Sequence, residues 1–187
     1  AIKTSANAVS STFTVTNTNP SGPGSFYDAV SQANSNGNPS EVDTIDFNIP
    51  GVSAYKFELP YGGATITEPV LLNGLTQAGS SCGHDLNIAY DVIQANVQGF
   101  NSPIVFGPGS DGSTIQGIDF QNRGSNGALV VTADNVNVRC NYFDMTQDGS
   151  NRVPDSVNAG QTSDGLQIYG DNITVGGPNL DDRNFLV

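Results

Sequence analysis

A short phrase that returns along the chain constrains the fold more than any other feature of the sequence. Residues 114–120 combine β-branched and small residues in an order that comes back at residues 137–143, so that Val138 lies 23 residues after Ile115. The first half of the phrase returns again at residues 174–177. A repeat of this length, built from short β-branched segments broken by small residues, is typical of one coil of a solenoid.

One amphipathic helix is predicted near the N-terminus, over residues 25–35. Ser25 and Asp28 have the spacing of an N-cap and its N3 partner, in which each side chain bonds the backbone amide of the other residue. The apolar residues behind this cap recur at helical spacing: Phe26, Ala29, Val30 and Ala33. We expect this helix to cover the first coil, because an uncovered sheet edge is a template for aggregation.

Elsewhere the pattern predicts short strands separated by Gly, Pro, Asn or Asp. The expected strands are residues 12–18, 44–49, 55–59, 64–67, 70–75, 86–97, 103–106, 114–120, 128–132, 136–143, 166–169 and 173–175. An antiparallel sandwich has no reason to repeat one phrase at a fixed spacing, whereas a coil of about three strands does. The sequence therefore predicts an all-β parallel β-helix.

Stacked coils are expected to place equivalent residues in columns, because no coil can bury its apolar face alone. Ile115 is predicted to lie over Val138, and Phe120 over Phe143. A further column collects small residues: Gly74, Gly117, Cys140 and Gly177.

Several segments also resemble a known family. They are Val15-Thr16-Asn17-Thr18-Asn19, Gly22-Pro23-Gly24-Ser25-Phe26, Ala29-Val30, Ala33-Asn34, Asp43-Thr44-Ile45-Asp46-Phe47-Asn48-Ile49-Pro50 and Asn73-Gly74-Leu75-Thr76-Gln77. Residues 12–185 resemble the start of bacterial right-handed parallel β-helix repeat proteins of the pectate-lyase-like superfamily. The resemblance implies a right-handed β-helix and an extracellular or cell-surface location. It implies no reaction, because this fold also occurs in adhesins, passengers, lyases and hydrolases.

The chain departs from the family at the helix cap. Proteins of this family often carry Leu-Arg after the capping serine, whereas this chain has Phe26-Tyr27. The chain therefore lacks that arginine.

The chain of 187 residues is long enough for one core. We expect residues 1–11 to form a flexible arm and residues 12–187 to form a single β-helix domain. Residues 183–187 look like a strand with no turn or cap after it. This ending predicts a longer native protein that continues into more coils, or end-to-end self-association at an open C-terminal coil.

Charge excludes some partners. Eighteen acidic residues against six basic ones give a net charge of −12, which repels nucleic acid and anionic membranes. No apolar run approaches the roughly 18 residues of a membrane-spanning helix. Cys82 and Cys140 are the two cysteines, and they form either a disulfide or two small buried apolar positions.

Outward-facing acids are the candidate catalytic residues. Alternation with Ile118 and Phe120 places Asp119 outward, and Tyr142 takes the same position one coil later. Together with Asp144 and Asp164, Asp119 would suit inverting glycoside hydrolysis, which uses two spaced carboxylates. The alternative is that these acids only satisfy backbone groups at coil corners. A lyase is less favoured, because it needs a base and arginine stays protonated.

Ligand and metal candidates come from the same part of the chain. The candidates for binding a glycan are Tyr142, Arg139 and Arg123. No cofactor is required, but hard oxygen ligands for calcium are available from Asp144, Asp148, Asp181 and Asp182. The sequence thus predicts a secreted or surface stalk, adhesive or carbohydrate-binding module. A polysaccharide-degrading enzyme, with a hydrolase favoured over a lyase, is the alternative.

Overall fold

The chain consists mostly of short strands with one α-helix, seen in a computed structural model that describes residues 9–37, 40–51, 55–60, 62–91, 103–121, 127–151 and 165–186. The strands form three parallel sheets, here called A, B and C. In spatial order, sheet A contains β1 (Thr12–Val15), β2 (Asp43–Phe47), β5 (Val70–Asn73), β8 (Thr114–Gln116), β11 (Asn137–Arg139) and β14 (Thr174–Val175). Sheet B contains β3 (Tyr55–Phe57), β6 (Ile88–Asp91), β9 (Asp119–Gln121), β12 (Tyr142–Phe143) and β15 (Phe185–Leu186). Sheet C contains β4 (Ala64–Ile66), β7 (Ile104–Phe106), β10 (Leu129–Val131) and β13 (Leu166–Ile168).

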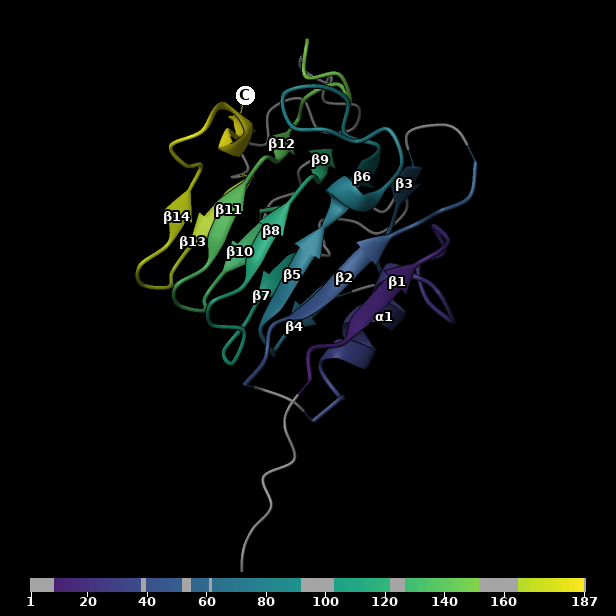
Figure 1. Cartoon of the computed structure of the whole chain (residues 1–187), viewed down its shortest axis with the longest axis vertical. Helices are drawn as coiled ribbons and strands as arrows, with labels where there is room; N and C mark the ends of the chain where they lie inside the picture. The colour runs from purple at the N-terminus through teal and green to yellow at the C-terminus, as the bar shows by residue number, and fades with distance from the viewer. Residues whose placement is uncertain are drawn as a thin grey trace, which may run out of the picture.

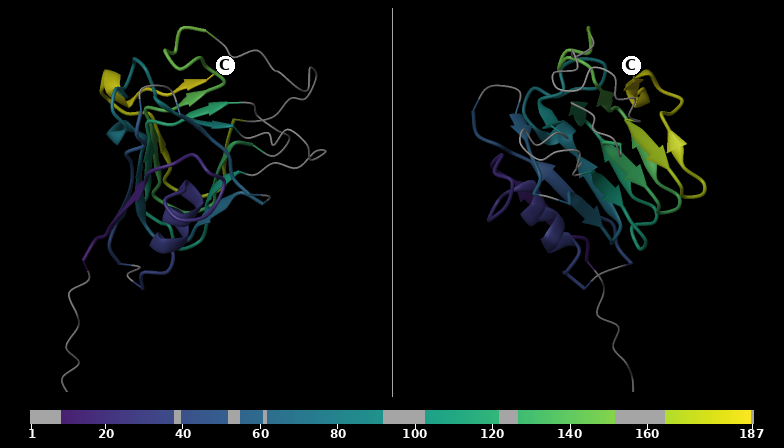
Figure 2. Two further views of the ribbon diagram at one scale, coloured as in Figure 1. Left: turned by 90° about the vertical axis from the view of Figure 1, so that its right-hand side faces the viewer. Right: turned by 180° about the vertical axis from the view of Figure 1, so that it is seen from behind.

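The order of strands along the chain explains why every sheet is parallel. After β2 the chain visits sheet B, then sheet C, and then returns to sheet A beside the strand it left, and it repeats this rotation. Figure 1 shows the strands of sheet A side by side, from β1 to β14, and Figure 2 shows the molecule from one side and from behind. Parallel neighbours need a long connection, and here the other two sheets supply it.

The predicted register of the columns is confirmed. Val138 pairs with Ile115, and Phe143 pairs with Phe120, whose ring stacks on it at a centroid distance of 4.9 Å. The same inner row of sheet B continues through Tyr90 to Phe57, at centroid distances of 6.2 and 5.1 Å. All these side chains are fully or almost fully buried, so the core is a set of stacked columns between the sheets.

Two segments that the sequence predicts as single strands are each two strands in different sheets. The chain turns from sheet A to sheet B at Gly117 and at Cys140, both of which adopt positive φ angles, of 76° and 55°. A side chain at Gly74 would collide with the backbone of Gly117, which explains why this column holds small residues. Alternation alone cannot show this corner, because inward residues continue on both sides of it.

The predicted helix is present as α1 (Phe26–Ala33), and its four apolar residues are buried. The Asp28 amide donates to Ser25 Oγ, as predicted. The reciprocal bond is wrong in detail, because the Asp28 carboxylate accepts from the amide of Gly24 instead of that of Ser25. Residues 1–8 of the expected arm lie outside the described residues, and the amide of Ser11 is already fixed by Asp43 Oδ1 at 2.7 Å.

Exposed apolar side chains gather in the last described strands and turns. Among the residues that the structure describes, eight large hydrophobic residues are exposed, and five of them lie there: Ile168, Tyr169, Val175, Leu180 and Leu186. End-to-end association at this coil stays a prediction.

Asparagines line the corner between sheets A and B. Asn141 is fully buried, its Nδ2 donates to the carbonyls of Ile115 and Arg139, and its Oδ1 accepts from the amide of Ile118. One coil later, Asn184 Oδ1 accepts from the Asn141 amide at 2.9 Å. This side-chain ladder satisfies backbone groups that the sharp turn removes from the sheets.

Asn141→Ala should therefore destabilise the fold by about 3 kcal/mol, because the buried Ile118 amide loses the acceptor Asn141 Oδ1 and the carbonyls of Ile115 and Arg139 each lose a bond from Asn141 Nδ2. Urea unfolding at equilibrium measures the loss. The control is Asn137→Ala on the half-buried outer side of β11, which should change stability by less than about 0.5 kcal/mol. Equal losses of unfolding free energy in the two variants would show that the hydrogen bonds of Asn141 at the corner do not stabilise the fold.

Candidate functional site

Two of the candidate residues, Asp119 and Tyr142, lie on the outer side of sheet B. Strand pairing places Lys56, Ala89, Asp119, Tyr142 and Phe185 in one row across β3, β6, β9, β12 and β15. Asp119 and Tyr142 occupy equivalent positions in adjacent strands, as predicted.

Asp119 does not reach the surface, and the expectation that it is available to a substrate is wrong. Its exposed fraction is 0%, although it lies on the side of the sheet away from the main core. Oδ2 accepts a hydrogen bond from Gln121 Nε2 at 2.5 Å, while Oδ1 is buried without a hydrogen-bond partner. Alternation gives the side of the sheet on which a residue lies, but not what covers that side.

The surroundings of Asp119 raise its pKa to about 7. Burial is the main cause, since it disfavours the charged form. The bond from Gln121 and the positive charge of Lys56 lower the pKa, whereas the negative charge of Asp144 raises it. Asp119 therefore exchanges its proton near neutral pH.

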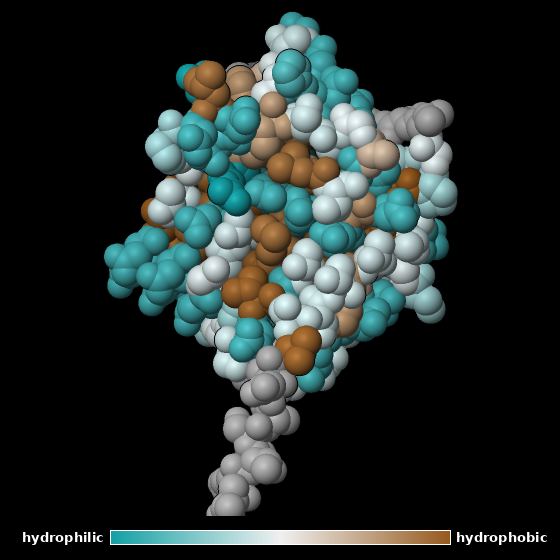
Figure 3. All heavy atoms as spheres, viewed as in Figure 1, coloured by the Kyte–Doolittle hydropathy of each residue, from teal (hydrophilic) through white to brown (hydrophobic). Residues whose placement is uncertain are grey.

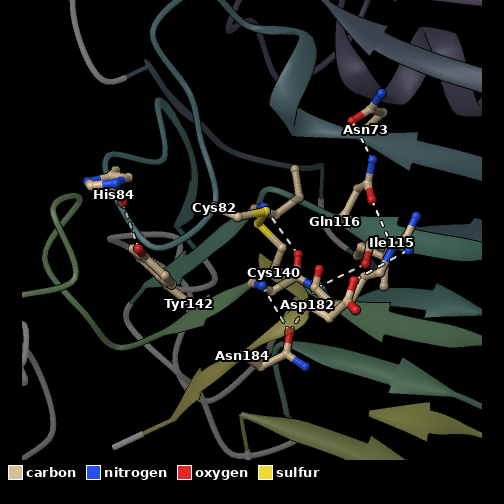
Figure 4. The surroundings of a disulfide bond; sticks show 12 residues. Asn73, Cys82, His84, Ile115, Gln116, Cys140, Tyr142, Asp182 and Asn184 are labelled. Carbon is tan, nitrogen blue, oxygen red and sulfur yellow. Dashed lines mark hydrogen bonds and ion pairs between the residues drawn. A yellow bond between two sulfur atoms is a disulfide. The ribbon is translucent and has the colours of Figure 1, made fainter. Parts of the chain in front are cut away.

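A small second cluster covers this end of the row. Leu86, Cys140, Tyr142 and Met145 are buried together, and Cys82 packs against them. A disulfide joins Cys82 to Cys140, with a Cα–Cα distance of 5.5 Å. Tyr142 Oη donates to the carbonyl oxygen of His84 at 2.6 Å (Figure 4). The segment around the disulfide, residues 77–86, thus folds over the outer side of sheet B.

Tyr142 is consequently not available to stack on a glycan, contrary to the prediction. Its ring is buried by the second cluster, and its hydroxyl is occupied by the backbone of His84. Burial and the charges of Asp119, Asp85 and Asp148, in that order, raise the pKa of its hydroxyl.

Asp144 follows β12 and is also buried, with a positive φ of 58°. Its position one residue beyond Phe143 brings it near Gln121 and Asp119, which explains its effect on the pKa of Asp119. Asp164, the third catalytic candidate, and Arg123, a glycan-binding candidate, lie outside the described residues. A carboxyl group with a raised pKa, such as that of Asp119, suits acid–base chemistry, but neither Asp119 nor Asp144 offers exposed surface to a polymer.

Arg139 belongs to a polar row on the outer side of sheet A. Its side chain is 44% exposed, its Nε donates to Gln116 Oε1, and an Nη atom lies 3.5 Å from Asp182. Gln116 Nε2 in turn donates to Asn73 Oδ1 at 2.9 Å. Arg139 is exposed enough to contact a ligand, but its guanidinium group is already bound to Gln116 and Asp182.

The four described calcium candidates do not gather into one group, and two of them, Asp148 and Asp182, already accept hydrogen bonds. Asp148 accepts from Thr146 Oγ1 and from the amide and hydroxyl of Ser150, and these bonds lower its pKa to about 2. Asp182 accepts from Asn179, whereas Asp181 is exposed. Within the part of the chain that the structure describes, no three histidine, cysteine or acidic residues group as a metal site would require.

A hollow beside the helical cap was not anticipated from the sequence. It lies between α1 and β4 and includes Tyr27, which is 42% exposed. The signal available in the sequence is Tyr27, an aromatic residue that lies off the apolar stripe of the helix.

Comparison of the chain with protein-family models, with curated protein sequences and with solved structures found no match. The function must therefore be inferred from the chain's own geometry. Among the described residues, no helix has the length and apolar character needed to cross a membrane.

Proposed function

We propose that the chain is a right-handed parallel β-helix, secreted or carried on a cell surface, that serves as a rigid stalk and presents a carbohydrate-binding surface. The observation that carries this proposal is the in-register parallel pairing of six strands in sheet A, repeated in sheets B and C. Contacts between consecutive coils alone support such a structure, which makes it stiff and extended.

Two further features support an extracellular location. Disulfides persist in oxidising compartments, and Cys82 and Cys140 are joined. The net charge of −12 keeps such a chain soluble and discourages binding to nucleic acid. The proposed function requires no cofactor.

A polysaccharide hydrolase is the second candidate, favoured by the pKa of about 7 at Asp119 and by the charge of Asp144 beside it. The complete burial of Asp119 argues against it, because a general acid must come within hydrogen-bond reach of its substrate.

A panel of neutral and acidic polysaccharides separates the two functions. We expect the chain to be retained on at least one neutral polysaccharide, with neither reducing-sugar release nor absorbance from unsaturated products. The matched variants are Asp119→Asn and Asp144→Asn. Sugar release that either variant abolishes would replace the binding function by the hydrolase, and retention on no member of the panel would leave only the stalk.

A further inference from the structure

A hollow of about 510 Å3 opens between the capping helix α1 and the first strand of sheet C, β4. Figure 2 shows α1 lying across the end of the sheets at which the chain begins. The helix contributes Tyr27 and Ser31, while Gly62, Gly63 and Thr65 contribute the opposite wall. The volume lies within the range of about 300–1,000 Å3 that is usual for small-molecule sites.

The walls of this hollow are fixed by Asn34, which occupies the open edge of β4. Its Nδ2 donates to the carbonyl of Thr65 at 2.7 Å, and its Oδ1 accepts from the amide of Thr67 at 2.8 Å. One asparagine side chain thus pairs with the strand as a neighbouring strand would, and it holds the end of α1 against the sheet. A site with such walls is largely preformed.

Glycines keep the far wall bare. Gly62 and Gly63 have φ angles of 95° and 76°, which residues other than glycine rarely adopt. A Cβ atom at Gly62 would meet nothing within 4 Å, so backbone faces open space there. A ligand can therefore approach peptide groups closely, opposite the ring of Tyr27.

The lining is chemically selective. None of the described residues that line the hollow is charged, in a chain whose net charge is −12. The lining offers the hydroxyl groups of Ser31 and Thr65. The hydroxyl of Ser35 donates a hydrogen bond to the carbonyl oxygen of Ser31 at 2.7 Å. A half-exposed aromatic ring with hydroxyl and peptide groups around it complements a neutral sugar, whose faces carry C–H groups and whose rim carries hydroxyls.

We propose that this hollow binds one or two units of a neutral saccharide, with Tyr27 as the stacking platform. The inference deepens the carbohydrate-binding part of the proposed function by naming its place and its ligand class. Uronic-acid sugars are disfavoured, because none of the described lining residues is a cation that could meet a carboxylate, and the net charge of the chain is negative.

Titration of the whole chain, followed by NMR of the backbone amides, tests the proposal. The probes are cellobiose, maltose and N,N′-diacetylchitobiose, with digalacturonic acid as the acidic control. We expect at least one neutral disaccharide to shift the amide signals of residues 27–35 and 62–65. Tyr27→Ala should weaken its binding by about tenfold or more, and Tyr27→Phe by less than about threefold.

Tyr169→Ala is the matched control, because it removes an equally large and more exposed tyrosine far along the chain, and it should leave binding unchanged. Unchanged thermal unfolding of Tyr27→Ala shows that the cap is intact. Sugar binding that survives Tyr27→Ala would overturn this site while leaving the carbohydrate-binding function in place. Absence of any neutral-sugar binding, or tighter binding of digalacturonic acid, would also overturn it.

Discussion

Replacing Asp119 by asparagine should stabilise the folded chain at pH 8 by as much as about 4 kcal/mol, and should leave its stability at pH 4 almost unchanged. The pKa of this carboxyl is about 7 in the folded chain, whereas an unfolded aspartate has a pKa of about 3.9. A difference of about three pKa units corresponds to about 4 kcal/mol. Asparagine keeps the shape and hydrogen-bonding capacity of the neutral acid but cannot ionise.

The direction follows from which state holds the proton. Below about pH 4 both the folded and unfolded chains are protonated at Asp119, so the group adds no pH dependence. Between about pH 4 and pH 7 the unfolded chain has lost the proton and the folded chain keeps it, so stability falls as pH rises. Above about pH 7 both states are ionised, and the full loss is present because the charge is then buried.

Equilibrium urea unfolding at pH 4, 6 and 8 measures this difference, since contributions from titrating groups that do not interact with Asp119 cancel between the two proteins. The control is Asp181→Asn, which makes the same charge change at an exposed position. A constant difference between Asp119→Asn and the parent at all three pH values would show that Asp119 is already solvated.

The repeated phrase predicted the columns because equivalent positions in its successive copies have the same apolar character. The pairs Ile115 with Val138 and Phe120 with Phe143 are in register as expected, and the apolar stripe of α1 is buried. Helical spacing within residues 25–35 sufficed for the stripe of α1, and the 23-residue repeat sufficed for the columns.

The candidate site could not be predicted in the same way. The sequence gives Asp119 and Tyr142 the correct side of their strands, yet both are buried there, and the segment around Cys82 covers Tyr142. This segment belongs to no repeat, so no periodic signal shows where it lies. The contacts of Asn34 with β4 are likewise invisible in the sequence, because they join a helix end to a strand more than 30 residues away.

Removing the Cys82–Cys140 disulfide should cost about 4 kcal/mol of folding stability. The two cysteines are 58 residues apart in sequence, and a crosslink of that span restricts the unfolded chain by about this amount. In the folded chain the same disulfide holds the segment 77–86 over Tyr142, whose hydroxyl donates a hydrogen bond to the carbonyl oxygen of His84. The bond therefore stabilises both the whole fold and the cover of sheet B.

Cys82→Ala combined with Cys140→Gly is the sharpest variant, because Cys140 has a φ of 55° and glycine adopts that angle without strain. The companion variant, Cys82→Ala with Cys140→Ala, should be less stable still by about 1 kcal/mol, the cost of a positive φ at alanine. Urea unfolding of both variants and of the parent, with and without a reducing dithiol, separates crosslink from backbone strain. The reduced parent should approach the variants. A loss below about 1 kcal/mol in the glycine variant would mean that stacking of the coils, and not the crosslink, already restrains this segment.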